Sequence, residues 1–231
     1  MMKSQQDQLK VQYKQRFTDT ADYRDSVWRI LCNDFFSRYI PTGSKLLELG
    51  AGWGEFINNI IATEKYAMDL NPDTGSHLAD EVKCIHQDCS SQWALESECL
   101  DVVFTSNFLE HLPDKASAGC VVSEAHRCLK QGGLFICMGP NIKFVPGAYW
   151  DFWDHHIPFT ELSCAELLRL HDFSIEQCIP RFLPYTMSTG TKPPLCLVKY
   201  YLKLPMLWSF FGKQFLIIGR ENTRGIMEAE Q

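Results

Sequence analysis

Five short apolar runs, separated by stretches with helical periodicity, constrain the fold of this chain more than any other feature. The runs begin near residues 45, 65, 82, 100 and 133, and they read KLLEL, KYAMDL, VKCIHQD, LDVVFTS and GGLFICMG. Strands that are spaced by helices form crossover units, in which a parallel sheet is covered on both faces. Between the last two runs, residues 120–130 predict a helix that stops at Gln131-Gly132-Gly133. The sequence therefore predicts an open α/β sheet.

The segments on either side of these runs complete one predicted domain over residues 1–231. Residues 1–40 have aromatic and aliphatic side chains at spacings of 3 and 4, which predicts amphipathic helix broken near Thr18–Asp22. The later segments are predicted as an aromatic loop, a helix at Glu161–Leu170, a strand at Phe173–Ile179, an insertion at 186–213 and a strand at Gln214–Arg220. We expect a helical lid at 1–44, a ligand-binding core at 45–141 and a substrate-side part at 142–231.

Charge and cysteine usage exclude several classes of protein. The net charge is −6 over 231 residues, so no global basic field would attract nucleic acid. The ten cysteines form no CxxC pair, and the polar start lacks the apolar core of a signal peptide. No apolar run reaches the ~18 residues that a membrane-spanning helix needs. These features predict a reduced, cytoplasmic protein with neither a disulfide framework nor a transmembrane segment.

The stretch LLELGAGWGEF carries the main candidate binding site. Gly50, Gly52 and Gly54 lie between a predicted strand and a predicted helix at Glu55–Ile61, where open parallel sheets bind their ligands. Asp69 follows at the end of the next strand, where an acid can accept both hydroxyls of a ribose. The third glycine of a dinucleotide fingerprint would fall at position 55, which is Glu55, and no Lys-Ser/Thr pair completes a P-loop. The pattern predicts a nucleoside ligand without phosphates.

These segments together resemble a known superfamily. LLELGAGWGEF, YAMDLNPD, IHQDCSS, LDVVFTSNFLEHLPD and HRCLKQGGLFICMGPN are similar, in order and spacing, to the signature blocks of class I S-adenosylmethionine-dependent methyltransferases. The resemblance covers residues 45–141 and implies S-adenosyl-L-methionine as cofactor. It also implies a Rossmann-like seven-stranded sheet of order 3-2-1-4-5-7-6 with helices on both faces. Strand 7 would be antiparallel, and Phe173–Ile179 and Gln214–Arg220 would be strands 6 and 7.

The resemblance also assigns residues to the cofactor, position by position. It places four residues at the methionine part: Glu48, Gly50, Ala51 and Gly52. The others are Asp69 for the ribose, Leu70, Asp88 and Cys89 for the adenine, Asn107 and Phe108 for the methionine end, and His111, which would pack over the cofactor. Arg24 in the front helix could pair with the methionine carboxylate or lie on a solvated helix face. Asp88 could instead cap a helix.

The loop GAYWDFWDHHIPFT, residues 147–160, is the candidate for the acceptor side. His155 or His156, oriented by Asp151 or Asp154, could act as a general base toward a hydroxyl acceptor. Asp154, His155 and His156 are also possible metal ligands. However, adjacent histidines point in different directions on an extended chain, and no second acid–histidine group is evident, so no metal is predicted. The remaining interpretation is that these side chains order the loop, with Thr160 capping the next helix.

A second, narrower resemblance concerns the acceptor. YRDSVW, FINNI and DHHIPFTELS are similar to a bacterial methyltransferase subgroup that accompanies glycan and polysaccharide biosynthesis, which implies O-methylation of a sugar, a glycan or another small hydroxylated metabolite. Three alternatives stay open: methylation of a quinone or other aromatic acceptor, a non-catalytic binding protein, and a nicotinamide dehydrogenase. Residues 195–213 mix apolar residues with lysines, which fits a lid, a homodimer surface or weak contact with a membrane surface.

Overall fold

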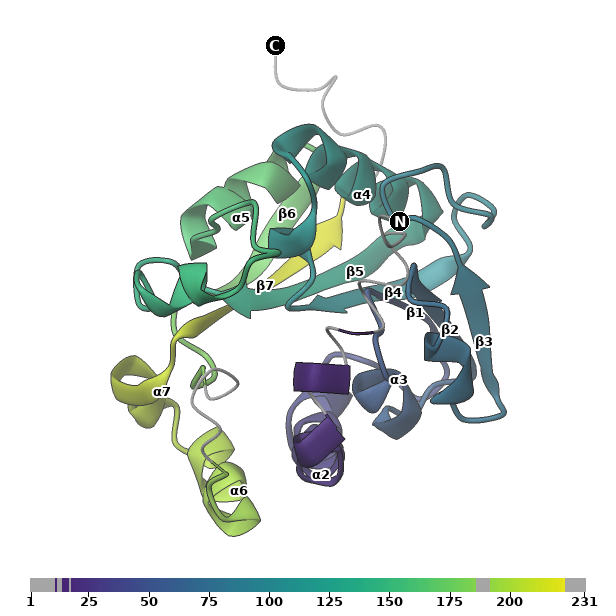
Figure 1. Cartoon of the computed structure of the whole chain (residues 1–231). Helices are drawn as coiled ribbons and strands as arrows, with labels where there is room; N and C mark the ends of the chain where they lie inside the picture. The colour runs from purple at the N-terminus through teal and green to yellow at the C-terminus, as the bar shows by residue number, and fades with distance from the viewer. Residues whose placement is uncertain (1–10, 12–13, 17, 186–191, 223–231) are drawn as a thin grey trace, which may run out of the picture.

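A seven-stranded sheet forms the centre of the molecule (Figure 1). The computed structural model describes residues 11, 14–16, 18–185 and 192–222. The strand order is β3-β2-β1-β4-β5-β7-β6, in which β7 runs antiparallel to β5 and β6 and the other pairs are parallel. The predicted fold class, order and orientation are confirmed. The strands are β1 (Lys45–Leu49), β2 (Glu64–Asp69), β3 (Val82–His86), β4 (Leu100–Ser106), β5 (Leu129–Pro140), β6 (Phe173–Ile179) and β7 (Gln214–Glu221).

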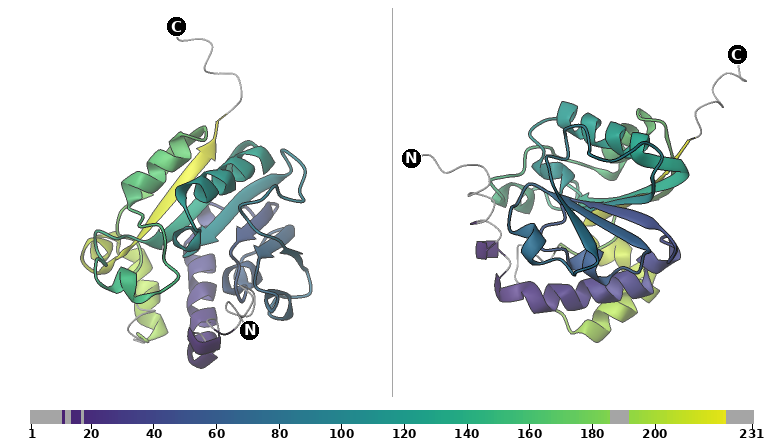
Figure 2. Two further views of the ribbon diagram at one scale, coloured as in Figure 1. Left: turned by 45° about the horizontal axis from the view of Figure 1, so that its top comes forward. Right: turned by 90° about the vertical axis from the view of Figure 1, so that its right-hand side faces the viewer.

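Helices cover both faces of the sheet (Figures 1 and 2). On one face lie α4 (Lys115–Cys128) and α5 (Glu161–Arg169), and on the other lie α2 (Ala21–Asp34), α3 (Glu55–Asn59), α6 (Leu195–Lys203) and α7 (Pro205–Phe211). Short 3-10 helices complete the described chain: η1 (Thr18–Thr20), η2 (Phe36–Arg38), η3 (Thr74–Ser76), η4 (Leu109–His111) and η5 (Ala148–Asp151). No helix within the described ranges is long and apolar enough to cross a membrane.

The two faces of the sheet build two separate cores because side chains alternate along each strand. In β1, Leu47 and Leu49 pack on the α4–α5 face, whereas Leu46 packs on the face of α2 and α3. The strands read as nearly continuous apolar runs because both faces are covered. Burying both sets of side chains fixes the strand register, since a slip of one residue would exchange the faces. The rigid sheet then holds the loops at its carboxyl edge in place.

One predicted boundary is wrong. The sequence predicted a helix over 120–130 that would stop at two glycines, but α4 ends at Cys128 and β5 already begins at Leu129. Gly132 lies inside the strand with φ of +74°, and the β4–β5 register shifts between Leu100 and Val102. Between the pairs Leu100–Leu129 and Val102–Leu134, β5 has three more residues than β4, and the left-handed glycine lies in this irregular stretch. The glycines therefore bend a strand and do not end a helix.

The insertion near the end of the chain forms two short helices. The sequence left residues 186–213 without assigned structure; residues 192–213 of this segment are described, and residues 186–191 lie outside the described residues. Pro205 begins α7 at a position where its missing N–H costs nothing. The predicted break in the front helical segment is confirmed, because η1 ends at Thr20 and α2 follows directly.

Candidate functional site

The glycine loop after β1 has a backbone that only glycine adopts without strain. Gly50, Gly52 and Gly54 have φ of +63°, +56° and +74°. Gly50 also has no room for a side chain, because a Cβ atom there would lie 2.4 Å from Cδ2 of Phe108. Phe108 follows β4, so the loop after the neighbouring strand lies directly against the glycine loop. The predicted ligand loop and one of its predicted lining residues are thus adjacent.

Asp69, at the end of β2, holds the glycine loop in place. Its Oδ2 accepts the backbone N–H of Gly52 at 2.7 Å, and its Oδ1 accepts that of Asn71 at 2.7 Å. Burial raises the pKa of this carboxyl, and the two backbone donors oppose the shift. A carboxylate oxygen has more than one acceptor site, so both oxygens of Asp69 can still accept a hydrogen bond from a ligand hydroxyl. This geometry suits the ribose role that the sequence predicted.

Two further carboxylates surround the loop. Glu48 is buried in β1, where its Oε2 accepts the N–H of Ile57 at 3.1 Å. Burial raises its pKa well above the usual range, and the nearby charges of Glu55 and Asp69 add to the effect. Glu55, in the position of the absent third glycine, forms an ion pair with Arg24 of α2 at 2.9 Å. Arg24, predicted at the methionine carboxylate, therefore contacts the loop through Glu55 in this structure.

The remaining residues predicted at the cofactor lie along the same edge of the sheet. Asp88 is exposed after β3, and its Oδ1 accepts both the N–H and the hydroxyl of Ser90 at 2.8 Å. It therefore orders a turn and does not cap a helix. Cys89 is buried beside it, and Asn107 has φ of +50° with its N–H donated to the carbonyl of Met138. Leu70 and Ala51 lie next to Asp69 and Gly50 in the chain, at the ends of their strands.

The three residues predicted as catalytic have different environments. Asp154 accepts both guanidinium nitrogens of Arg16, at 2.7 and 2.9 Å, and lies 3.2 Å from Nδ1 of His111. Burial opposes its ionisation, yet the hydrogen bonds from His111 and Arg16 hold the pKa of Asp154 well below its usual range. His155 is buried, which lowers its pKa to about 4, and His156 is exposed. The sequence predicted that Asp154 would orient His155 or His156. In the structure Asp154 instead orients His111.

The residues predicted for this site include neither Glu110 nor Arg16, although the structure places both there. Glu110 in η4 is buried, and its backbone carbonyl accepts the N–H groups of His156 and Ile157, which pins the acceptor-side loop to η4. Arg16 reaches the same loop from 138 residues away in the chain. The sequence found no second acid–histidine group near the loop, but η4 supplies one in Glu110 and His111. The sequence shows Glu110 and His111 directly after the fourth strand. It does not show that they lie close to His155, because that proximity depends on tertiary packing.

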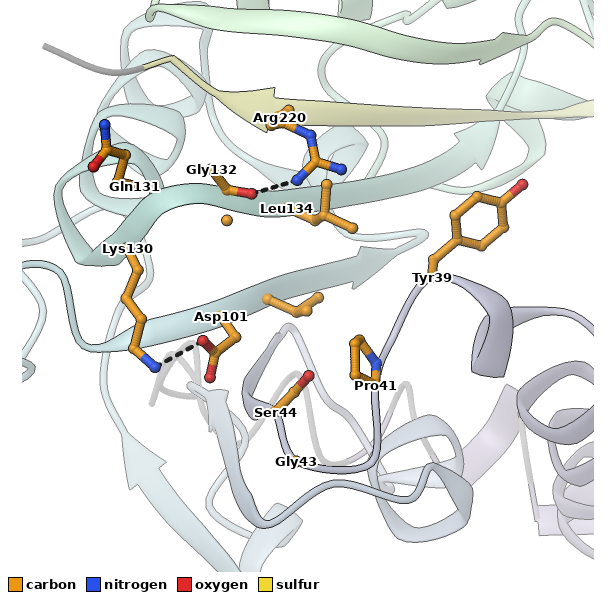
Figure 3. Close-up of a pocket in the computed structure, with 12 residues that line it drawn as sticks. Tyr39, Pro41, Gly43, Ser44, Asp101, Lys130, Gln131, Gly132, Leu134 and Arg220 are labelled. Carbon is orange, nitrogen blue, oxygen red and sulfur yellow. Dashed lines mark hydrogen bonds and ion pairs between the residues drawn. The ribbon is translucent and has the colours of Figure 1, made fainter.

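A cavity of about 410 Å³ lies far from these groups (Figure 3). Its lining includes Asp101 at the start of β4, Ser44 just before β1, and Lys130 in the first residues of β5. It is therefore at the amino edge of the sheet, whereas ligands of open α/β sheets bind at the carboxyl edge. Asp101 accepts the N–H of Lys45 and the ammonium of Lys130, which is a structural role. We place the candidate site at the glycine loop.

Known proteins show the same arrangement of sequence and fold. Residues 47–137 match the model of a family described as methyltransferase domain. A curated relative from Mycolicibacterium smegmatis, named "Probable S-adenosylmethionine-dependent methyltransferase", is 31% identical over 149 residues. Over these residues the chain is similar to S-adenosylmethionine-dependent methyltransferases. The similar region spans 61% of this chain and 56%, little more than half, of that methyltransferase.

Solved structures agree on the methyltransferase fold. A protein from Haloferax volcanii, solved in complex with the Trm112 methyltransferase activator, matches with a TM-score of 0.68 over 96% of this chain and 99% of that chain, at 14% identity. A SAM dependent methyltransferase from Archaeoglobus fulgidus matches with a TM-score of 0.61 over 84% and 94%, at 19% identity. At such identities the likeness concerns the fold.

The name of the curated relative implies S-adenosyl-L-methionine as cofactor, and the acidic groups at the loop fit it. Glu48, Glu55 and Asp69 bring three carboxylates together, and only Glu55 has an ion-pair partner among them in the described chain. These acidic groups disfavour a pyrophosphate and suit a ligand whose reactive half is cationic, as a sulfonium with an α-ammonium is, because a bound cation stabilises the ionised form of each carboxyl group.

Proposed function

We propose that this chain is an S-adenosylmethionine-dependent methyltransferase that methylates a hydroxyl group of a sugar, a glycan or another small hydroxylated metabolite. The observation that carries the proposal is the ring of Glu48, Glu55 and Asp69 around the glycine loop, next to a second polar cluster after β4. We further propose that residues 1–231 act as one domain, with the front segment as a lid over the core. Arg16 and Arg24 support this, since both connect the front segment to site loops.

The residues of the site have separable roles in this proposal. Asp69 and the glycine loop hold the cofactor, which supplies an electrophilic methyl group when bound. Phe108 and the loop after η5 position the acceptor oxygen in line with that methyl group, which is catalysis by proximity and orientation. A hydroxyl acceptor must also lose a proton, and the group formed by buried Glu110, half-buried His111 and buried His155 could accept that proton. Asp154 positions His111.

Exposed aromatic side chains support a sugar acceptor. Trp153 is 90% exposed and Trp150 is more than half exposed, and both flank the acidic Asp151. Sugars stack their apolar faces on aromatic rings while their hydroxyls bond to polar groups nearby. The same rings would suit a quinone or another aromatic acceptor, which is the alternative substrate class. A screen of both classes with a labelled methyl donor decides between them, and transfer to neither would favour the non-catalytic binding protein.

Calorimetry tests the cofactor part of the proposal. S-adenosylhomocysteine should bind with a micromolar Kd, and Asp69→Ala should weaken binding by at least about 30-fold, because hydrogen bonds to a charged group contribute ~1.5–3 kcal/mol. Asp80→Ala, which removes an exposed acid before β3, is the matched control and should leave the Kd unchanged. Tight binding of NADH with no affinity for S-adenosylhomocysteine would contradict the proposal and favour the dehydrogenase.

Variants of the acceptor loop test the catalytic part. His155→Ala should reduce methyl transfer strongly while the affinity for S-adenosylhomocysteine stays nearly intact, because His155 is buried in the polar cluster. His156→Ala should have a smaller effect, because its side chain is exposed. Equal loss of turnover in both variants would contradict the assignment of the larger role to His155.

We also propose that α6 and α7 contact an anionic membrane surface, which would suit a lipid-linked acceptor. Residues 192–213 contain four lysines and no acid, in a chain of net charge −6. Several large apolar side chains of the two helices are exposed: Leu197, Tyr200, Met206, Phe210 and Phe211. Apolar side chains interleaved with lysines are typical of helices that lie in a membrane interface.

A further inference from the structure

One ligand-capable side-chain atom from each of Glu110, His111 and His155 lies within 4.8 Å of the other two. We call these three residues the Glu–His cluster. Glu110 and His111 belong to η4, directly after β4, and His155 belongs to the loop after η5. Glu110 and His155 are 3% and 6% exposed, so two of the three side chains are almost completely removed from water. A carboxylate and two imidazoles buried this closely need a compensating partner.

The hydrogen bonds of His111 leave one of its ring nitrogens, Nε2, available to bind a ligand. Its Nδ1 lies 3.0 Å from the backbone carbonyl of Asp154 and 3.2 Å from the Oδ2 of the same residue. Two oxygen acceptors at Nδ1 assign the ring proton to that atom, which leaves Nε2 with the free lone pair. Arg16 fixes the Asp154 carboxylate through two hydrogen bonds. A carboxylate that accepts from the second nitrogen is the usual support of a metal-binding histidine.

His155 offers a nitrogen that has no partner. Its Nδ1 is buried and makes no hydrogen bond to any residue that the structure describes. The ring is held by aromatic neighbours: its centroid lies 4.5 Å from that of Tyr149, 5.0 Å from that of Phe152 and 4.8 Å from that of His111. An unsatisfied buried polar atom is costly and is kept only for a reason. A cation bound at Nδ1 would satisfy it.

We propose that the Glu–His cluster binds a zinc ion through a carboxylate oxygen of Glu110, Nε2 of His111 and Nδ1 of His155. Two imidazoles and one carboxylate suit zinc and other first-row transition metals, whereas magnesium and calcium prefer all-oxygen sites. Zinc bonds of ~2.1 Å at tetrahedral angles place ligand atoms about 3.4 Å apart. Atoms at the 4.8 Å limit must therefore approach one another by about 1.4 Å, through rotation of the side chains. A fourth position would stay open toward water or an oxygen of a ligand.

Titration of zinc into chelator-treated protein tests the site directly. One zinc ion should bind with a Kd that Glu110→Gln and His155→Ala each weaken by at least about 100-fold, since each removes a direct ligand. His156→Ala is the matched control, because it removes the adjacent but exposed histidine and should leave the Kd unchanged. Asp154→Ala should weaken zinc binding by about 10–100-fold, as loss of a supporting carboxylate does.

Binding of S-adenosylhomocysteine to each variant shows that it is folded, because that ligand uses the glycine loop. Cobalt as a spectroscopic probe identifies the ligand types, since ten cysteines offer competing thiolates. Absence of zinc binding, zinc binding that survives both cluster substitutions, or a cobalt spectrum with thiolate bands would each overturn the proposal. If zinc binds but S-adenosylhomocysteine does not, the proposed function fails and the zinc site stands.

Discussion

The carboxyl group of Glu48 is buried, and it lies where the cationic half of the cofactor is expected. In the folded protein its pKa is raised, so between pH 4.5 and that raised value the folded state holds a proton that the unfolded state has lost. The contribution of Glu48 to stability therefore falls as the pH rises through this window. The residue reduces the stability of the empty protein at neutral pH, which is expected of a group retained for binding.

Glu48→Gln should therefore stabilise the protein at pH 7 and weaken the cofactor. The amide oxygen can still accept the N–H of Ile57, so we expect a gain of about 1–2 kcal/mol, or roughly 2–8 °C in Tm. The gain should shrink toward pH 4. Affinity should drop more for S-adenosylmethionine than for S-adenosylhomocysteine, which lacks the sulfonium charge. Calorimetry and thermal melts measure both effects, with exposed Glu166→Gln as control; a lower Tm at pH 7 would contradict the argument.

At the scale of residues, the sequence predicted groups whose positions follow from strand ends. Glu48, Gly50 and Asp69 could be found because each lies at or beside the carboxyl end of an apolar run. The pairing of Arg16 with Asp154 could not be found, because no spacing rule joins residues 138 positions apart. The role of Asp154 was predicted for the wrong histidine for the same reason: His111, although distant in the chain, is the ring that it reaches.

At the scale of elements, the apolar runs predicted most strands to within a few residues. They failed at the boundary between α4 and β5, where a glycine allows two interpretations. Gly132 could end a helix or bend a strand, and only pairing with β4 decides for the bend. The helices α6 and α7 were not predicted, because Pro193, Pro194 and Pro205 divide this segment into pieces shorter than the window over which helical periodicity can be recognised. An exposed apolar surface of this size is typical of a site that contacts a membrane or another protein.

Sedimentation with lipid vesicles tests the surface of α6 and α7. The wild-type protein should bind vesicles with anionic phospholipid, bind neutral vesicles weakly, and lose binding as salt screens the lysines. Substituting both Phe210 and Phe211 by serine should weaken binding by at least about 10-fold, because each buried aromatic contributes ~1.5–3 kcal/mol. Leu162 on α5 and Leu170 directly after it are both exposed and provide the control pair. Equal binding by both double variants would remove the proposed membrane contact.

At the scale of the whole molecule, α2 joins the front segment to the core through charge as well as through packing. Trp28 of α2 packs between Phe36, Phe56 and Phe104, and Arg24 reaches Glu55 at the start of α3. The side chains of Arg24 and Glu55 are 17% and 11% exposed. Breaking a buried ion pair from one side leaves a charge without compensation.

Arg24→Met alone should therefore lower the free energy of unfolding by about 3 kcal/mol. Combined with Glu55→Gln it should recover most of the loss, because neither charge is then left unpaired. Chemical denaturation of the wild type, both single variants and the double variant measures the coupling energy. Additive losses would show that α2 is held by packing alone, and that the front segment can open without affecting the glycine loop.

Glu55 also limits how the ligand preference of the site could change by mutation. It fills the position that a dinucleotide-binding loop reserves for glycine, and it is also the residue to which α2 is joined. A mutation of Glu55 to glycine, toward the dinucleotide pattern, would also remove the ion pair that joins α2 to the start of α3. The choice of ligand and the closure of the chain over it can therefore change only together.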